Sequence, residues 1–288
     1  MDLDLRQSAD GSFSAYNKDF SQCYHSLKCG ALSESLHKHI LPTFLLYASK
    51  KICATLNNQT NNLHTHNFTK NFSQFFTNYL SDIVYDNNAK KELAILDICF
   101  GLGYNTFASI YFYSLFGFPC KLRIYTPELD EKMLKNLQYF PYPKEFSNIN
   151  IQAIMHDLLT YQRHDLPHCS IELFIGDATN YLKMLPTQSL DIIYHDAFSP
   201  KENPKLWSVE FFSDLYAALR GNGIISTYSQ SRTIRENAFS QGFLVYDCRA
   251  KLCDIKTGSL MSKRNIECIA LLSQFYQLTP YKNTLMQC

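Results

Sequence analysis

The sequence predicts an α/β protein: a seven-stranded, mainly parallel sheet with helices on both faces, an antiparallel edge strand and a small β-rich N-terminal segment. From residue 93 onward, short apolar runs of strand length alternate with longer amphipathic stretches, as in strand–helix–strand units. The last two runs follow each other without a clear helix, which predicts an antiparallel hairpin at the sheet edge. Hydrophobic residues make up 46 % of the 288 positions, enough to bury a core of this size.

Three regions divide the chain. Residues 1–50 contain short alternating patches rich in aromatic residues, which predict a small β-rich segment that packs on the functional site. Residues 51–92 are rich in Asn and carry Phe at roughly helical spacing, which predicts a partly helical insertion or connector. Residues 93–288 hold the alternating pattern and form the main domain.

Seven apolar runs define the expected strands of the main domain. They are Ala94–Phe100, Leu122–Tyr125, Ile171–Ile175, Leu190–Tyr194, Gly223–Tyr228, Phe243–Asp247 and Ile266–Leu272. The amphipathic stretches predict helices at Thr106–Phe116, Asp130–Leu137, Ala178–Leu185, Ser208–Leu219 and Ser231–Gln241. This alternation brings the carboxyl ends of the parallel strands to one edge, where such sheets bind ligands.

The loop after the first strand carries a glycine pair. It runs from Asp97 through Gly101 and Gly103 to Asn105, where a helix opens. Glycines let a ligand approach the backbone closely, and a helix N-terminus favours electron-rich groups. A single G-x-G is weak evidence, so the other strand ends must support a site here.

Acids stand at the ends of the next two strands. Glu128 ends the second strand, where a carboxylate can accept hydrogen bonds from both hydroxyls of a ribose. Asp177, before Ala178, follows the third strand and can accept a hydrogen bond from an adenine amino group. Either acid alone is equally well a helix N-cap. With the glycine loop, they predict a nucleoside site.

Two sequence features that the loop lacks indicate which nucleoside binds there. A dinucleotide site has a third glycine where this chain has Thr106, and an ATP site has a lysine in G-x-x-x-x-G-K. The loop has neither feature. A ligand with adenosine but no phosphates is left, and S-adenosyl-L-methionine fits that description.

The fourth strand leads into the most distinctive stretch, which ends at Trp207, the single Trp of the chain. Asp196, at the end of this strand, lies over the expected position of the methyl donor, where a carboxylate can hold an amine nucleophile and receive its proton. An Asp here also orders loops as an Asx turn. Phe198, Pro200 and Trp207 form a stiff loop that either stacks on a flipped-out base or packs as a lid. His195 faces the other side of the strand and is expected to be structural.

The net charge of +1 excludes indiscriminate nucleic-acid binding, which needs a large positive excess. The charge is uneven, because residues 220–288 hold nine Lys and Arg but four Asp and Glu. This quarter of the chain is therefore a candidate phosphate-binding face, with ordinary solvated charge as the alternative. The residues expected to carry it are Arg249, Lys251, Lys263 and Arg264.

Composition points to the cytoplasm. The N-terminus lacks the apolar core of a secretory signal, and no apolar stretch is long enough to cross a bilayer. Ten Cys without a C-x-x-C pair indicate reduced thiols rather than a zinc site or a disulfide framework. The pairs His37/His39 and His64/His66 have no acidic or Cys cluster beside them, so no metal is expected.

On these residues the chain resembles the methyltransferase half of MnmC, the bifunctional tRNA 5-methylaminomethyl-2-thiouridine biosynthesis protein, and its standalone relatives. One matching block, Ser8–Ile40, contains Ala9-Asp10-Gly11-Ser12, Tyr24-His25-Ser26, Gly30-Ala31 and Glu34-Ser35. The other extends from Leu93 to about Leu272 and contains the glycine loop with Asn105, the stretch from Asp196 to Trp207, and Lys263-Arg264.

The resemblance implies a Rossmann-like class I methyltransferase fold with S-adenosyl-L-methionine as donor. The acceptor would be the amine of 5-aminomethyl(-2-thio)uridine at the tRNA wobble position, converted to the 5-methylaminomethyl form. Asp196 matches the catalytic aspartate. Cofactor contacts are implied for Asp97, Gly101, Gly103, Asn105, Glu128, Asp177, Ala178 and Glu34, and substrate contacts for Phe198, Pro200, Trp207, Lys263 and Arg264.

The sequence departs from that family in three places. Cys99 stands where the first loop glycine is usual, Glu202 stands where a lysine is common, and the FAD-dependent oxidase half is missing. A separate oxidase or an upstream tRNA-modifying complex is thus a conceivable partner. Two alternatives stay open: a spermidine-synthase-like transferase acting on a small amine, and a non-catalytic module that binds S-adenosyl-L-methionine or RNA.

Overall fold

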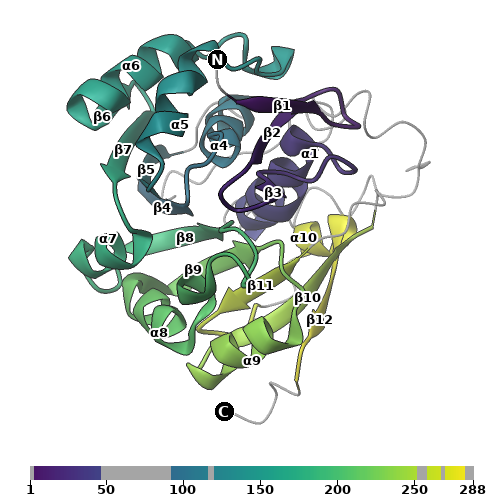
Figure 1. Cartoon of the computed structure of the whole chain (residues 1–288). Coiled ribbons are helices and arrows are strands. Elements are labelled where there is room, and N and C mark those ends of the chain that lie inside the picture. Colours follow the sequence, from purple (N-terminus) through teal and green to yellow (C-terminus); the bar gives the residue numbers. More distant parts are fainter. Residues whose placement is uncertain (1–2, 47–91, 116–119, 252–257, 267–269, 283–288) are drawn as a thin grey trace.

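The computed structural model of the chain describes residues 3–46, 92–115, 120–251, 258–266 and 270–282 (Figure 1). Within them lies a nine-stranded sheet. Its strands are β4 (Glu92–Ile98), β5 (Lys121–Glu128), β6 (Arg163–Leu166), β7 (Cys169–Ile175), β8 (Leu190–His195), β9 (Leu219–Thr227), β10 (Leu244–Ala250), β11 (Ser259–Ser262) and β12 (Tyr276–Pro280).

Helices connect and cover these strands. They are α4 (Tyr104–Leu115), α5 (Glu131–Asn136), α6 (Ile151–Tyr161), α7 (Ala178–Met184), α8 (Val209–Ala218), α9 (Arg232–Ser240) and α10 (Ala270–Phe275). Short 3-10 turns lie at Leu137–Tyr139, Lys144–Phe146 and Pro204–Trp207. The five helices expected from the sequence are all present, with ends that differ from the expected ones by at most two residues.

The strand order confirms the predicted fold class. It is β12-β10-β11-β9-β8-β4-β5-β7-β6, and β7, β5, β4, β8 and β9 are parallel neighbours. β11 lies antiparallel between β9 and β10. The seven strands from β10 to β7 therefore make the expected sheet with its antiparallel hairpin. β6 and β12 extend it by one antiparallel strand at each edge.

Each face of the sheet has its own core because successive side chains of a strand point to opposite faces. Ile95 of β4 enters the cluster formed with the N-terminal segment, α4, α5 and α6. Its neighbours Ala94 and Leu96 enter the second cluster, formed with α7, α8 and α9. Both faces are thereby covered, as parallel strands require.

One expected strand is wrong. The run Ile266–Leu272 was predicted as the last strand, but the hairpin partner of β10 is β11, Ser259–Ser262, and α10 begins at Ala270. β11 has only four residues, two of them Ser, so it lacks the apolar run that marks a buried strand. Its serines are nevertheless satisfied, since Ser259 Oγ donates to the carbonyl of Ser229 at 2.8 Å.

Helix α6 and strand β6 are among the elements that were not expected from the sequence. Helix α6 begins at an N-cap, Asn150, whose side chain accepts the Ala153 N–H at 3.2 Å. Strand β6 reads Arg-His-Asp-Leu and pairs with β7 in antiparallel register. A polar, four-residue strand is typical of a sheet edge and carries no apolar periodicity.

The N-terminal segment forms a separate three-stranded antiparallel sheet, β1 (Asp4–Gln7), β2 (Phe13–Asn17) and β3 (Gln22–Cys23), followed by helix α1 (Ala31–Ser35). The expected β-rich segment is therefore present. Figure 1 shows it beside α4, over the middle of the large sheet. The Tyr104 hydroxyl of α4 joins the two parts by donating to the Phe13 carbonyl at 2.7 Å.

Helix α1 continues as a π-helical turn, Leu36–Ile40, and as helix through residues 41–46. Its N-terminus is capped by residues of the first matching block. The Ser33 N–H binds the Asp10 carboxylate at 3.0 Å, and the Ala31 N–H binds the Ser12 hydroxyl at 3.0 Å. A Cβ at Gly30 would lie 1.9 Å from Asp10 Cγ, so this position requires glycine. Mid-helix π turns often mark functional sites.

The predicted Asn-rich insertion lies almost wholly outside the described residues, as does the pair His64/His66. None of the helices in the described ranges is both long enough and apolar enough to cross a membrane.

Candidate active site

The glycine loop joins β4 to α4 in a left-handed backbone conformation. Cys99, Gly101 and Gly103 have φ angles of 66°, 54° and 76°. Only glycine adopts such angles without steric cost, so Cys99 stands at a position that favours glycine. The Gly103 N–H donates to the Phe100 carbonyl at 2.8 Å and closes the turn.

Glu128, at the end of β5, holds this loop in place. Its Oε2 accepts the Gly101 N–H at 2.8 Å, and its Oε1 accepts the N–H groups of Leu129 and Asp130 at 2.8 and 2.9 Å. Burial outweighs these bonds and raises the pKa of Glu128. Because each carboxylate oxygen has two lone pairs, Oε2 keeps one for a ligand hydroxyl.

Asp177 caps helix α7, which is the alternative that the sequence left open. Its Oδ1 accepts the Thr179 N–H at 2.7 Å and the Thr179 hydroxyl at 2.6 Å. Burial alone would raise the pKa of Asp177, but these two bonds outweigh it and lower that pKa. No hydrogen bond to Oδ2 occurs among the described residues, so a cap does not preclude a ligand contact. Ala178 begins the helix and is buried.

Asp97 and Asp196 are linked through Asn105. The Asn105 amide Nδ2 lies 3.3 Å from Asp97 Oδ1 and 3.0 Å from Asp196 Oδ2, so one amide bridges two carboxyls. Asp97 is fully buried and also accepts the Thr106 hydroxyl at 2.8 Å. It therefore supports the site through Asn105 and Thr106. A direct cofactor contact by Asp97, implied by the resemblance, does not fit this full burial.

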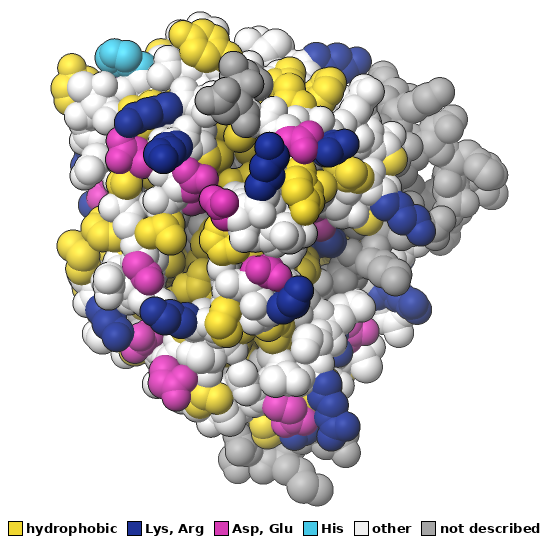
Figure 2. Space-filling view, in the orientation of Figure 1, with side chains coloured by type: hydrophobic (Ala, Val, Ile, Leu, Met, Phe, Trp, Pro, Cys, Tyr) yellow, Lys and Arg dark blue, Asp and Glu magenta, His cyan; other side chains and the backbone are white. Residues whose placement is uncertain are grey.

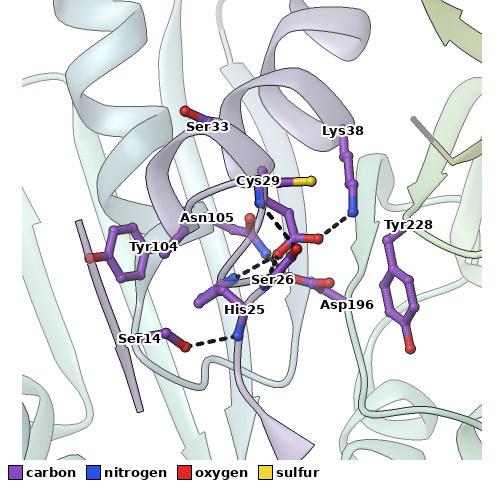
Figure 3. A network of polar contacts seen from close by, with 12 residues as sticks. Ser14, His25, Ser26, Cys29, Ser33, Lys38, Tyr104, Asn105, Asp196 and Tyr228 are labelled. Atoms are coloured by element: carbon purple, nitrogen blue, oxygen red, sulfur yellow. Dashed lines mark hydrogen bonds and ion pairs between the residues drawn. The ribbon is translucent and has the colours of Figure 1, made fainter. Parts of the chain in front are cut away.

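A buried ion pair comes from the N-terminal segment. Glu34 pairs with Lys38 one helical turn later, accepts the Ser26 N–H at 2.7 Å and lies 3.6 Å from His25 Nδ1 (Figure 3). Burial alone would raise the pKa of Glu34, but the nearby imidazole of His25 and the charge of Lys38 outweigh it and hold that pKa below its usual range. Asp196 and Asn105 lie beside His25 and Ser26 of this cluster in Figure 3, and the charge of Glu34 acts on Asp196.

His39, on the π-helical turn, faces Asp196. Its Nε2 lies 3.6 Å from Asp196 Oδ1, and its Nδ1 lies 2.9 Å from Ser226 Oγ. Burial would raise the pKa of Asp196, but the nearby imidazole of His39 outweighs burial and lowers that pKa. The sequence showed His39 only as half of an i,i+2 histidine pair. Its partner Asp196 is 157 positions away, so no local signal identifies the contact.

Three buried polar atoms around Asp196 make no hydrogen bond within the described part of the chain. They are His25 Nδ1, His39 Nε2 and Asn105 Oδ1. Buried polar atoms normally have partners, so such a group of atoms is typical of a site that receives a polar ligand. No group of His, Cys, Asp and Glu in the described ranges is arranged to hold a metal ion.

The loop after Asp196 places its aromatic residues differently from expectation. Phe198 is half-buried and packs on Phe20 and Tyr24, with ring centroids 4.8 and 5.1 Å away, and Pro200 is exposed. Trp207 is 2 % exposed, donates its indole N–H to the Phe198 carbonyl at 2.7 Å and packs on His195 at 4.1 Å. Trp207 thus supports the loop from the core, and its expected stacking on a base does not fit this burial.

His195 is structural, as expected. Its Nε2 lies 2.7 Å from the Leu206 carbonyl, and burial lowers its pKa to about 4. The imidazole is therefore neutral near pH 7.

Lys263 and Arg264, expected to contact the substrate, lie at the edge of the sheet opposite to Asp196. Ser262 pairs with Ile224, so the residues that follow it lie at the amino end of β9, whereas Asp196 follows the carboxyl end of β8. The length of a six-residue strand, roughly 17 Å, separates these edges. Lys263 Nζ instead donates to the Leu219 carbonyl at 2.6 Å, and Arg264 contacts Asn222 at 3.2 Å.

Part of the positive charge of residues 220–288 is paired with acids in the described ranges. Several cations of this quarter pair with acids: Arg220 with Asp191, Arg235 with Asp247, and Lys282 with Glu236. Figure 2 shows Lys and Arg interspersed with Asp and Glu on the visible face. The excess of basic residues in the sequence is therefore partly neutralised by pairing, as the alternative reading held.

Comparison with known proteins identifies the class of site. Residues 143–251 match a family described as S-adenosyl-L-methionine-dependent methyltransferase. MnmC2 from Aquifex aeolicus superposes with a TM-score of 0.65 at 23 % identity, over 91 % of this chain and 70 % of that one, and shows the same fold. The bifunctional protein MnmC of Campylobacter hominis is 24 % identical over 69 % of this chain. This chain is similar to S-adenosyl-L-methionine-dependent methyltransferases and to MnmC.

A further relative is an uncharacterized protein of Methanocaldococcus jannaschii, 25 % identical over 52 % of this chain. The chain spans 41 % of the length of that protein and 30 % of the length of the Campylobacter hominis protein.

The family that residues 143–251 match depends on S-adenosyl-L-methionine, and the polar groups at the strand ends fit this cofactor. Glu128 Oε2 retains a lone pair suited to a ribose hydroxyl, and Asn105 Oδ1 is buried without a hydrogen bond in the described ranges. A Cβ at Gly101 would lie 3.2 Å from the Tyr24 ring, so a side chain has little room there. We assign Glu128, Asp177, Asn105 and the two loop glycines to this cofactor as a proposal.

Proposed function

We propose that the chain methylates the primary amine of 5-aminomethyl(-2-thio)uridine at the wobble position of tRNA, with Asp196 orienting the amine and receiving its proton. The observation that carries this proposal is the position of Asp196. Its carboxylate lies at the end of β8 beside the glycine loop, with a lowered pKa and three buried polar atoms nearby that make no hydrogen bond in the described ranges.

The reaction requires the protein mainly to orient the amine and to remove one proton from it. When bound, S-adenosyl-L-methionine supplies a methyl group on sulfonium sulfur, which passes to the amine nitrogen as the carbon–sulfur bond breaks. The amine attacks only when neutral, and an alkylamine near pH 7 is mostly protonated. Asp196 holds the amine by hydrogen bonding, and Asn105 Oδ1 is placed to accept a second N–H. Fixing the amine in this way supplies orientation and removes one proton.

Support for a tRNA acceptor comes from the relatives. Those named MnmC are described as acting in tRNA 5-methylaminomethyl-2-thiouridine biosynthesis. Phe198 with Phe20 and Tyr24 gives a half-buried aromatic surface next to Asp196, on which a base can stack. We also propose that the protein acts in the cytoplasm and that a separate enzyme supplies the aminomethyl group. The division of the chain into three regions at residues 50 and 92 is part of the same proposal.

Methyl transfer from labelled S-adenosyl-L-methionine tests the acceptor. The acceptors compared are tRNA bearing 5-aminomethyluridine, the same tRNA already methylated, and putrescine. We expect label only in the unmethylated tRNA, at the wobble nucleoside. Transfer to putrescine alone would instead establish a small-amine transferase. Cofactor binding without transfer to any amine would indicate a non-catalytic module.

A further inference from the structure

The site contains a second proton-accepting group besides Asp196. A carboxylic acid is far more acidic than an alkylammonium group, so Asp196 is a good electrostatic partner for the ammonium group but a poor store for its proton. A proton taken from the amine therefore needs another acceptor close by. His39 is the buried imidazole next to this carboxylate, with Nε2 at 3.6 Å from Asp196 Oδ1.

The hydrogen bonding of His39 suits this task. Its Nδ1 lies 2.9 Å from Ser226 Oγ on β9, while Nε2 is buried without a hydrogen bond in the described ranges. When Nδ1–H donates to Ser226, the lone pair of Nε2 faces Asp196. A separation of 3.6 Å is longer than a hydrogen bond, but contacts of this kind commonly tighten when substrate binds.

The fold presents His39 from an unusual turn. The π-helical turn Leu36–Ile40 directs Lys38 toward Glu34 and Tyr228, and His39 toward Asp196 and Ser226. Titratable and charged groups around His39 come from its own helix and from the elements packed on it. They are Glu34, Lys38, His25, Asp97, Tyr194, His195, Asp196 and Tyr228.

We propose that His39 is the terminal proton acceptor of the reaction, paired with Asp196; this inference rests on the proposed amine methylation. The N–H bond of the alkylammonium breaks, and its electron pair stays on nitrogen. The proton passes through an Asp196 oxygen to the Nε2 lone pair, while the Nδ1–H group keeps its hydrogen bond to Ser226 Oγ. The resulting imidazolium faces the Asp196 carboxylate and returns its proton to solvent after the product leaves.

The activity test compares the wild type with His39→Gln between pH 6 and 9, at saturating cofactor and aminomethyl-tRNA. Glutamine can hydrogen-bond to Ser226 and Asp196 but cannot take a proton. We expect kcat to fall about 10²-fold near pH 7, within the range of general-base contributions. The deficit should shrink toward pH 9, where solution deprotonates more of the amine, and cofactor affinity should stay unchanged. His37→Gln, on the opposite side of the same turn, should keep the wild-type pH profile.

A second readout needs no turnover. Ring-nitrogen NMR of the free protein follows protonation of His39 in the wild type and in Asp196→Asn, and the ring should become protonated at lower pH when Asp196 is neutral. Wild-type methylation with the same pH profile in His39→Gln would overturn the inference and leave the proposed function standing. A His39 ring that becomes protonated at the same pH in the wild type and in Asp196→Asn would also overturn the inference and leave the proposed function standing. Absence of amine methylation by the wild type would remove the proposed function itself. If His39→Gln does not fold, Ser226→Ala replaces it, with the same pH-dependent deficit expected.

Discussion

The carboxyl group of Asp97 is fully buried beneath the glycine loop. Burial raises its pKa to about 8, even though Thr106 and Asn105 hydrogen-bond to it. In the unfolded chain an Asp titrates near about 4. Between these values the folded protein binds one more proton than the unfolded chain, so the free energy of unfolding falls as pH rises from about 4 to about 8.

Replacing Asp97 with Asn should remove that part of the pH dependence. An amide has no charge to bury, and its oxygen still accepts the Thr106 hydroxyl. We expect the melting temperature of Asp97→Asn to fall less between pH 5 and 9 than that of the wild type, as measured by circular dichroism. Parallel pH profiles for the two proteins would show that Asp97 is ionised in the folded state at neutral pH.

Cys99 is the residue of the glycine loop whose side chain conflicts with its backbone. A left-handed residue with a Cβ costs roughly 1–2 kcal/mol, and a β-branched residue tolerates the conformation least. Cys99→Gly should therefore be neutral or stabilising by up to about 1 kcal/mol and should keep cofactor binding. Cys99→Val should lose stability and cofactor affinity together. Urea unfolding and calorimetric titration with S-adenosyl-L-methionine measure both, and equal effects of Gly and Val would contradict this account.

At the scale of the element, helix α1 and its π turn carry a buried ion pair into the site. The side chains of Glu34 and Lys38 are 9 % and 8 % exposed. Removing one partner of such a pair leaves the other charge buried, which typically costs about 3–5 kcal/mol. Because the pKa of Glu34 is lowered, this stabilisation is present at neutral pH and disappears as the carboxyl group is protonated in acid.

Glu34→Gln should therefore lower the free energy of unfolding by about 3–5 kcal/mol at pH 7, measured by urea unfolding. The double variant Glu34→Gln/Lys38→Met removes the uncompensated charge and should recover most of that loss. If the double variant is as unstable as Glu34→Gln, the loss of stability does not come from an unpaired buried charge on Lys38.

For the whole molecule, sequence reasoning succeeded where the signal is local. Strands such as β4 and β8 are continuous apolar runs because both faces of the sheet are covered, and the acids at the ends of β5, β7 and β8 follow from chain order. Strands β6 and β11 were not predicted, because neither is apolar enough or long enough to be recognised in the sequence.

The site residues that could not be predicted depend on packing between distant segments. His39 meets Asp196 only because the N-terminal helix lies across the sheet, and Trp207 is removed from the surface by packing on His195. Lys263 and Arg264 were expected at the site but lie at the opposite edge of the sheet, because the register of the antiparallel strand β11 decides which edge the residues after it reach.

The central claim is that Asp196 acts on the acceptor amine rather than on the cofactor. Asp196→Ala tests it most directly, by single-turnover methylation of aminomethyl-tRNA together with calorimetric titration of S-adenosyl-L-methionine. The account predicts a loss of transfer of about 10²–10⁴-fold with nearly unchanged cofactor affinity. Transfer within a few-fold of the wild type, or loss of cofactor binding in step with activity, would contradict it.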